Sequence, residues 1–175
     1  VLHACELYDA LPVHRVEGAA GGPAEQWVAA RRGTLQLAAR SPSPAVRAYL
    51  EEHAIQLAEG QVAELNLEAR PLHRQLLERA GEGIALVLDY GYETHRLYRS
   101  RGRHGGSLTT YRRHRLGRNP LETPGEVDLT AHVNWDDLRL AAADAGWRRG
   151  GEAGGRRDPL PGAAQPGARR RRGCG

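Results

Sequence analysis

The sequence lacks three residue types and is poor in a fourth. Among its 175 residues there is no Met, no Phe and no Lys, so all 25 basic residues are Arg, and only two Cys occur, near opposite ends. Two distant cysteines exclude a disulfide framework and a cysteine-rich metal site. No apolar run approaches the roughly 20 residues of a membrane-spanning helix, so no span is predicted. The Arg-only, Ala- and Gly-rich composition indicates a coding sequence rich in G and C.

Charge divides the chain into two parts. Residues 1–147 carry 17 Arg against 19 acids, a net of −2, whereas residues 148–175 carry eight Arg against two acids, a net of +6. Residues 1–147 therefore lack the excess of positive charge that is typical of nucleic-acid-binding proteins. The tail has almost no apolar content, which predicts disorder. It is either the product of a shifted reading frame or a native Arg/Gly tail that binds RNA or acidic partners.

The most informative stretch begins with an apolar run at residues 84–88 that stops at Asp89-Tyr90-Gly91. Such a run predicts a buried strand of a parallel sheet, and residues 1–5 read as the end of another strand. Open α/β folds bind their ligands at the carboxyl ends of such strands. Candidate site residues of this stretch lie at strand ends and in loops: Asp89, Tyr90, Tyr111, His114, Asp128 and His132.

The segment before this stretch predicts short strands followed by helices. Strands are expected near residues 13–16, 27–29 and 34–37, separated by glycine-containing turns, and together they indicate an antiparallel insertion. We expect His14 to make a structural polar contact, with a catalytic base as the alternative. Residues 61–65 are expected to be extended.

Helix signals are clear at three places. Ser43 and Pro44 predict a helix start. That helix is expected to run to Glu59-Gly60. A second helix is expected to end near Ala80, and Asn134 predicts the cap of a third, over residues 135–145. The predicted apolar positions are, in the first helix, Val46, Tyr49, Leu50 and Leu57, with His53 outside; in the second, Leu72, Leu76 and Ala80; in the third, Trp135, Leu138, Leu140 and Ala141.

Residues 92–106 are polar and rich in Arg. This composition predicts a mobile, solvated loop, and a lid that closes over a substrate is the functional alternative.

Four blocks in order resemble the MidA-like family of S-adenosyl-L-methionine (SAM)-dependent methyltransferases. This family includes a mitochondrial arginine methyltransferase that assists assembly of respiratory complex I. The blocks are Glu6 to Arg15, Leu88 to Gly91, Gly106 to Arg115 and Pro124 to Asn134, and the resemblance covers residues 1–147.

The resemblance implies an α/β fold with a partial Rossmann-like class I methyltransferase sheet. The antiparallel insertion and the disordered C-terminal tail predicted above complete the expected fold. Residues 1–147 would form the C-terminal part of the methyltransferase domain, and residues 148–175 the tail. The implied cofactor is SAM. The implied site residues are catalytic Glu6, Asp9 and Asp89, and substrate-binding Asp128, His114 and His132. Without the resemblance, Glu6 and Asp9 would be read as caps of the following turn.

Two departures from the family pattern bear on function. Cys5 stands where the family usually has Asn, and Cys cannot supply the amide's donor and acceptor. The glycine-rich turn after a buried strand that would hold the cofactor is absent. We therefore expect the sequence to be part of a longer protein, with the cofactor half upstream, and this chain alone to be inactive. A processing artefact is the alternative explanation for a chain without Met.

The resemblance also implies partners. We expect a protein substrate, with a respiratory-complex subunit as the candidate, and a location in the bacterial cytoplasm or, alternatively, the mitochondrial matrix. Other functions left open are a catalytically inactive partner-binding or assembly module and RNA binding through the tail; the body itself is not expected to bind nucleic acid.

Overall fold

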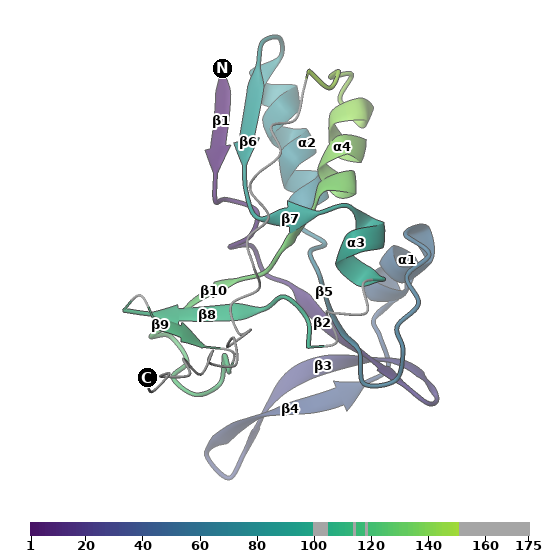
Figure 1. Cartoon of the computed structure of the whole chain (residues 1–175), viewed down its shortest axis with the longest axis vertical. Helices are drawn as coiled ribbons and strands as arrows, with labels where there is room; N and C mark the ends of the chain where they lie inside the picture. Colours follow the sequence, from purple (N-terminus) through teal and green to yellow (C-terminus); the bar gives the residue numbers. More distant parts are fainter. Residues whose placement is uncertain (100–104, 114, 118, 151–175) are drawn as a thin grey trace, which may run out of the picture.

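The computed structural model describes residues 1–99, 105–113, 115–117 and 119–150. The predicted disordered tail, residues 148–175, lies almost wholly outside this part of the chain. Within it the fold is mixed α/β, with a pair of parallel strands and adjoining helices at one end and the larger antiparallel sheet at the other (Figure 1).

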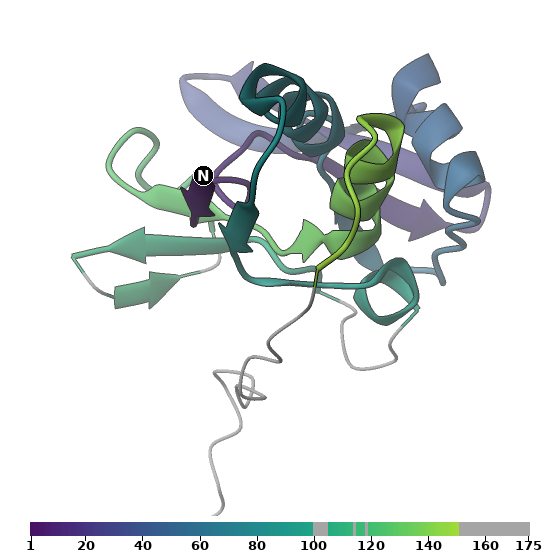
Figure 2. The same ribbon diagram turned by 90° about the horizontal axis from the view of Figure 1, so that it is seen from above.

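The two strands predicted for the parallel sheet do pair. β1 (Leu2–Cys5) runs parallel to β6 (Ala85–Leu88), which lies more than 80 residues away in the sequence. Helices α2 (Ala69–Ala80) and α4 (Trp135–Asp144) lie side by side next to this pair (Figure 2). The prediction that this strand is buried was wrong, because Leu86 and Leu88 of β6 are exposed, while Ala85 and Val87 are only partly buried.

A second, shorter parallel pair continues the chain beyond Asp89. β7 (Gly91–Tyr92) pairs with β11 (Val133–Asn134). A glycine is required at position 91, because a Cβ there would lie 2.3 Å from the carbonyl oxygen of Val133. Asn134 then caps α4, as predicted, by accepting a hydrogen bond from the backbone N–H of Asp136.

The predicted antiparallel strands form one sheet, which contains a fourth strand. The sheet has the order β4–β3–β2–β5, in which every neighbouring pair is antiparallel. Its strands are β2 (His14–Ala19), β3 (Gly22–Arg31), β4 (Thr34–Arg40) and β5 (Val62–Leu65). A separate antiparallel sheet has the order β10–β8–β9, formed by β8 (Thr109–Arg112), β9 (Arg115–Gly117) and β10 (Asp128–Thr130).

One helix prediction and one loop prediction required correction. α1 (Pro44–Glu52) begins where Ser43 predicted but ends well before Glu59. Ala54 has a positive φ of 48°, which is incompatible with a continuing helix. The expected mobile loop after β7 instead contains the short helix α3 (Thr94–Tyr98); residues 100–104 of that loop lie outside the described residues.

The buried stripe of α2 differs from the predicted one. Ala69, His73 and Leu77 are buried, while Leu72 and Leu76 are only partly buried and Ala80 is exposed. In α4, Leu138 and Ala141 are buried as predicted, but Leu140 is exposed. Helical spacing alone leaves the orientation of a helix uncertain by about one residue, and the polar partner of His73, described below, fixes it here.

His53 was predicted to face solvent, but its side chain is only 6% exposed and belongs to a polar network that joins three helices. Its Nε2 lies 2.9 Å from a carboxylate oxygen of Asp137, whose other oxygen accepts a hydrogen bond from the Tyr49 hydroxyl. Asn134 donates to Tyr49, and Thr94 of α3 donates to Asn134. Every charged group in this network has a partner, so it holds α1, α3 and α4 together.

Candidate active site

The carboxyl ends of β1 and β6 bring three predicted acidic residues together. The loop after β1 carries Glu6 and Asp9, and Asp89 directly follows β6. One carboxylate oxygen of Asp89 accepts hydrogen bonds from the backbone N–H groups of Leu7 (3.1 Å) and Tyr8 (2.9 Å). Asp89 therefore holds the loop in place as well as contributing charge to it. Glu6 has a positive φ of 48°, a conformation that non-glycine residues adopt only when their surroundings impose it.

Asp9 is the most perturbed acid of this group. It is only 5% exposed, and its Oδ1 has no hydrogen-bond partner among the described residues. Burial, then the charges of Asp89 and Glu6, raise the pKa of Asp9 to about 6, and a side-chain hydrogen bond to Asp89 acts in the same direction. Burial also raises the pKa of Asp89, while hydrogen bonds from the loop backbone oppose that shift. Asp9 therefore holds a proton at pH values below about 6, beside the carboxylate of Asp89.

The loop after β1 is held to α2 by buried hydrogen bonds that were not predicted. Tyr8 is fully buried, and its hydroxyl lies 2.6 Å from Nδ1 of His73 in α2. Burial, with the charge of Asp89, raises the pKa of Tyr8 to about 12, and burial lowers the pKa of His73, so both groups are neutral at pH 7. Asn66 donates to the backbone carbonyl of Tyr8 and accepts from the N–H of Ala69 at the start of α2. Nothing in the linear sequence pairs Tyr8 with His73, which are 65 positions apart.

The other predicted site residues do not join the carboxylate group directly. Asp128 is exposed on β10, where it lies opposite Tyr111 of β8. His132 is partly buried, and its ring centroid lies 5.4 Å from that of Tyr92. Between them, the backbone N–H of Ala131 donates to the carbonyl of Asp9 at 2.9 Å, so this segment adjoins the acidic loop. His114 lies outside the described residues. His14 makes the structural contact expected of it, with Nδ1 2.8 Å from Glu25.

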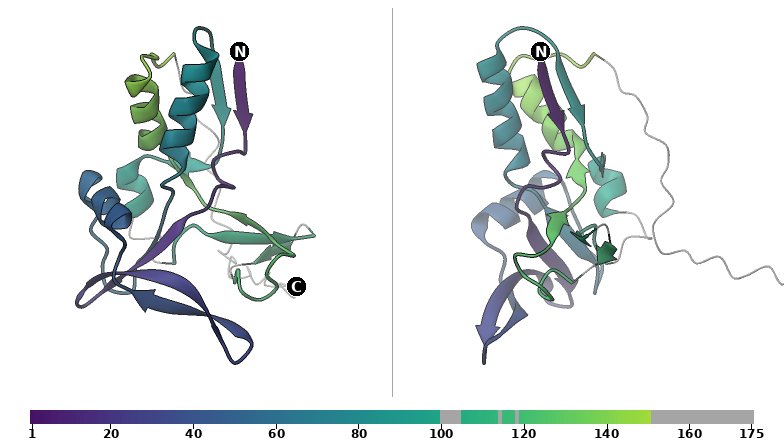
Figure 3. Two further views of the ribbon diagram at one scale, coloured as in Figure 1. Left: turned by 180° about the vertical axis from the view of Figure 1, so that it is seen from behind. Right: turned by 90° about the vertical axis from the view of Figure 1, so that its left-hand side faces the viewer.

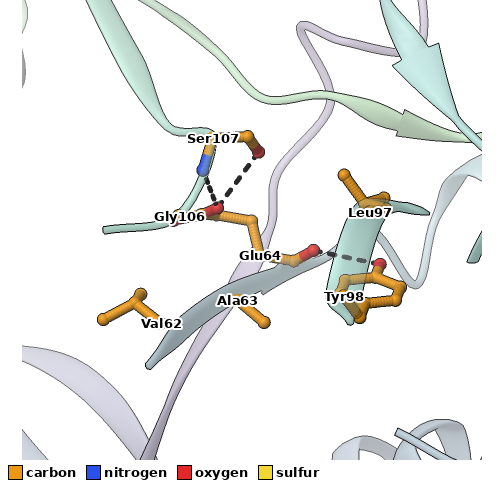
Figure 4. A pocket seen from close by; sticks show the side chains of 7 residues that line it. All are labelled: Val62, Ala63, Glu64, Leu97, Tyr98, Gly106 and Ser107. Atoms are coloured by element: carbon orange, nitrogen blue, oxygen red, sulfur yellow. Dashed lines mark hydrogen bonds between the residues drawn. The ribbon is translucent and has the colours of Figure 1, made fainter. Parts of the chain in front are cut away.

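Another buried acid, Glu64 of β5, lines a small pocket (Figure 4). Its Oε2 accepts hydrogen bonds from both the backbone N–H and the hydroxyl of Ser107, and Arg15 lies 3.5 Å from its Oε1. The Ser107 hydroxyl in turn accepts from the N–H of His132. The pocket volume of about 10 Å³ is close to that of one water molecule. Glu64 therefore anchors the segment before β8 and offers no room for a substrate.

Two further searches concern the described residues alone. No three or more His, Cys, Asp or Glu side chains of the described ranges are arranged to hold a metal ion. Likewise, no helix within those ranges has the length and apolarity needed to cross a membrane.

Comparison with known proteins gives one family and several structures. A family model described as "Putative S-adenosyl-L-methionine-dependent methyltransferase" matches residues 1–153. A crystal structure from Burkholderia thailandensis, described as a "likely methyl transferase" and bound to S-adenosyl-homocysteine, is 32% identical with a TM-score of 0.74, and the match covers 82% of this chain and 37% of that one. An uncharacterized protein of the same superfamily, from the same organism, is 32% identical with a TM-score of 0.75, covering 82% and 38%. The chain thus spans well under half the length of these two structures. Comparison with curated proteins gave no match.

Proposed function

The chain belongs to this family of SAM-dependent methyltransferases, and from that membership we propose that its acidic loop is the acceptor-binding part of a methyl-transfer site. The proposed acceptor is an arginine side chain of a protein. The observation that carries the proposal is the convergence of Glu6, Asp9 and Asp89 at the carboxyl ends of β1 and β6. Ligands of open α/β folds bind at this edge of the sheet.

A guanidinium group fits the charge and geometry of these acids. It is planar, always cationic, and presents several N–H donors that pair with carboxylates in a bidentate manner. The buried Oδ1 of Asp9 has no hydrogen-bond partner in the part of the chain that the structure describes and can accept one of these donors. Bound guanidinium would also relieve the mutual repulsion that raises the pKa of Asp9. Binding is therefore expected to release a proton when the pH is near 6.

The same acids can remove the proton that the acceptor must lose. A guanidinium nitrogen that gains a methyl group gives up a proton, and a general base works best when its pKa lies near the working pH. In the free protein the pKa of Asp9 is about 6, closer to that optimum than the pKa of an ordinary aspartate. Binding of the guanidinium lowers this pKa, so the carboxylate is ionised in the complex and able to accept the proton. In this assignment Asp9 is the base, Asp89 positions the loop, and Glu6 contributes negative charge. Asp128, His132 and His114 remain proposed substrate contacts at the margin of the loop.

The described residues do not by themselves form a cradle for SAM. When bound to a family member, SAM supplies the methyl group as an activated sulfonium. Its adenosine moiety requires a glycine-rich turn between a parallel strand and a helix. Here β1 leads through the acidic loop into β2, and β6 leads into β7. Three glycines are already packed closely against the protein itself, because a Cβ atom at any of them would lie less than 3 Å from a neighbouring atom: Gly18, Gly91 and Gly106. We therefore assign no cofactor contact to a residue of this chain.

The finer assignments rest on the four sequence blocks. We propose that the chain is MidA-like and that β1 and β6 belong to a Rossmann-like class I sheet, of which this chain carries a part. The parallel pairing of β1 with β6 supports that assignment. The substrate protein would then be a respiratory-complex subunit, in the bacterial cytoplasm or the mitochondrial matrix. The antiparallel sheet agrees with the proposed insertion within residues 1–147.

Calorimetric titration with matched peptides tests the proposed acceptor. One peptide carries a central arginine and the other carries citrulline, which has nearly the same shape but no charge. We expect the arginine peptide to bind at least about tenfold more tightly, since a charge-assisted hydrogen bond contributes about 1.5–3 kcal/mol. Its affinity should fall as the pH drops below 6, because protonation of Asp9 removes the negative charge that binds the guanidinium.

Two variants sharpen this test. Asp9→Asn should abolish the preference for arginine over citrulline, whereas Asp144→Asn removes an exposed carboxylate on α4, outside the acidic loop, and should change the ratio by less than about threefold. Equal binding of the two peptides by the unmodified chain, or an unchanged preference in Asp9→Asn, would refute the assignment of an arginine acceptor to this loop.

A further inference from the structure

The outer hairpin, β3 with β4, lies at the end of the molecule opposite α2 and α4 (Figure 3). Beyond Gln26 its side chains are mostly exposed. The pairing of Val28 with Leu37 and of Ala30 with Leu35 places these four apolar residues on one face. Val28 is 56% exposed, Leu37 44% and Leu35 37%. A two-stranded ribbon that buries neither face is only marginally stable in water, so a binding partner for this face would stabilise it.

The free edge of β4 lacks the usual protection against pairing. β4 is the first strand in the order β4–β3–β2–β5, and among the described residues it pairs only with β3. At the opposite edge, β5 forms a parallel bridge between Val62 and Gly105. Exposed edges are commonly guarded by charges, Pro or bulges. The run from Thr34 to Ala39 has no charge and no Pro, and its register with β3 is continuous.

Positive charge marks both ends of this edge. Arg31 and Arg32 stand at the hairpin tip and Arg40 at the far end of β4, and all three are exposed. Residues 27–40 contain no Asp or Glu. The Arg40 guanidinium lies 5.3 Å from the ring centroid of Trp27, which orients it beside the hairpin. A strand added to β4 would thus meet apolar side chains along its middle and cations at both ends.

We propose that the free edge of β4 is a docking site for an extended segment of a protein partner, with alternating apolar side chains and acidic residues at its two ends. Main-chain hydrogen bonds to β4 supply affinity, as in other cases of strand addition. Alternate side chains of the segment cover Leu35 and Leu37, and its terminal acids pair with the arginines. Two copies of β4 in antiparallel pairing would instead bring Arg40 of each copy to the arginine tip of the other, so charge disfavours self-association.

A synthetic peptide as long as β4, with Val at alternate positions and two Glu at each end, is the probe. Its binding to the whole chain is measured by fluorescence anisotropy, beside a second peptide that has Lys in place of Glu. We expect the Glu-ended peptide to bind at least about tenfold more tightly than the Lys-ended one. The double variant Arg31→Glu with Arg32→Glu should narrow or reverse this preference.

Main-chain pairing is tested on the peptide, so no protein variant has to fold. Two N-methylated peptides carry methyl groups on alternate amides, one on the odd set and one on the even set. Strand addition uses the amides of only one set, so one methylated peptide should lose binding by about tenfold or more while the other retains it. Loss of binding with neither set, or equally with both, would overturn strand addition.

The apolar face is tested with Leu35→Thr and Leu37→Thr together, which retains β-propensity and removes apolar surface. We expect weaker peptide binding, with unchanged circular dichroism and unchanged arginine-peptide binding at the acidic loop. The proposal is overturned if the Glu-ended peptide does not bind the unmodified chain. It is equally overturned if sedimentation shows self-association that the two Thr substitutions abolish, since β4 would then pair with a second copy.

Discussion

Replacement of Asp9 by Asn is expected to stabilise the folded chain at neutral pH, although it should impair binding at the acidic loop. Asp9 is buried next to Asp89, and Glu6 adds further negative charge. Folding therefore moves this carboxylate from water to a site that disfavours its charged form. Such a cost is typical of functional residues, whose replacement commonly raises stability.

The size of the effect follows from the pKa. Burial and the neighbouring charges raise the pKa of Asp9 from 3.8 to about 6. Because one pKa unit corresponds to about 1.4 kcal/mol, the ionised carboxylate costs up to about 3 kcal/mol of stability at pH 7.5. The amide of Asn leaves one polar atom poorly satisfied, so the expected gain is about 1–3 kcal/mol.

The dependence on pH has a definite sign. The pKa of Asp9 is higher in the folded state than in the unfolded state. The ionised carboxylate therefore lowers the free energy of unfolding by its full amount above pH 6, and this cost disappears as the pH falls from 6 towards 3.8. Urea unfolding of the unmodified chain and of Asp9→Asn, at pH 7.5 and at pH 4, measures the difference. The variant should be more stable at pH 7.5, and the two proteins should be nearly equal at pH 4.

Asp128→Asn is the matched control, because the Asp128 side chain is exposed and should change stability by no more than about 0.5 kcal/mol at either pH. If Asp9→Asn is no more stable than the unmodified chain at pH 7.5, or keeps the same advantage at pH 4, the description of Asp9 as a destabilised ionised group is wrong.

Two other predictions concern the buried network and the cofactor. Asp137→Ala should lower the free energy of unfolding, measured with urea, by about 3–5 kcal/mol, because it leaves the His53 side chain without its partner. The control Asp144→Ala, in the same helix, should cost less than about 1 kcal/mol. Equal losses in the two variants would contradict a structural role for the network. Calorimetric titration of the chain with SAM should show no micromolar binding, because neither β1 nor β6 leads through a glycine-rich turn into a helix. Micromolar binding would place a cofactor site in this chain.

The sequence was informative wherever a signal is local. Ser43 and Asn134 cap helices as predicted, because a cap depends on hydrogen bonds within one turn. The apolar run before Asp89 forms β6, and the glycine-containing turns separate β2, β3 and β4. The acids at the ends of β1 and β6 could also be named as site candidates, since the carboxyl ends of parallel strands meet at one edge of a sheet.

Only the tertiary structure decided which groups meet. The sequence does not show that Asp89 binds the backbone of Leu7 and Tyr8, because that contact joins segments about 80 residues apart. The pKa of Asp9 depends on this juxtaposition and on burial, neither of which is a property of the residue itself. Likewise His73 faces inward because Tyr8 offers it a hydrogen bond, which overrides the apolar stripe that helical spacing favoured in α2. Local propensity thus determined the elements, while long-range packing and hydrogen bonding determined the faces they bury and the chemistry of the acidic loop.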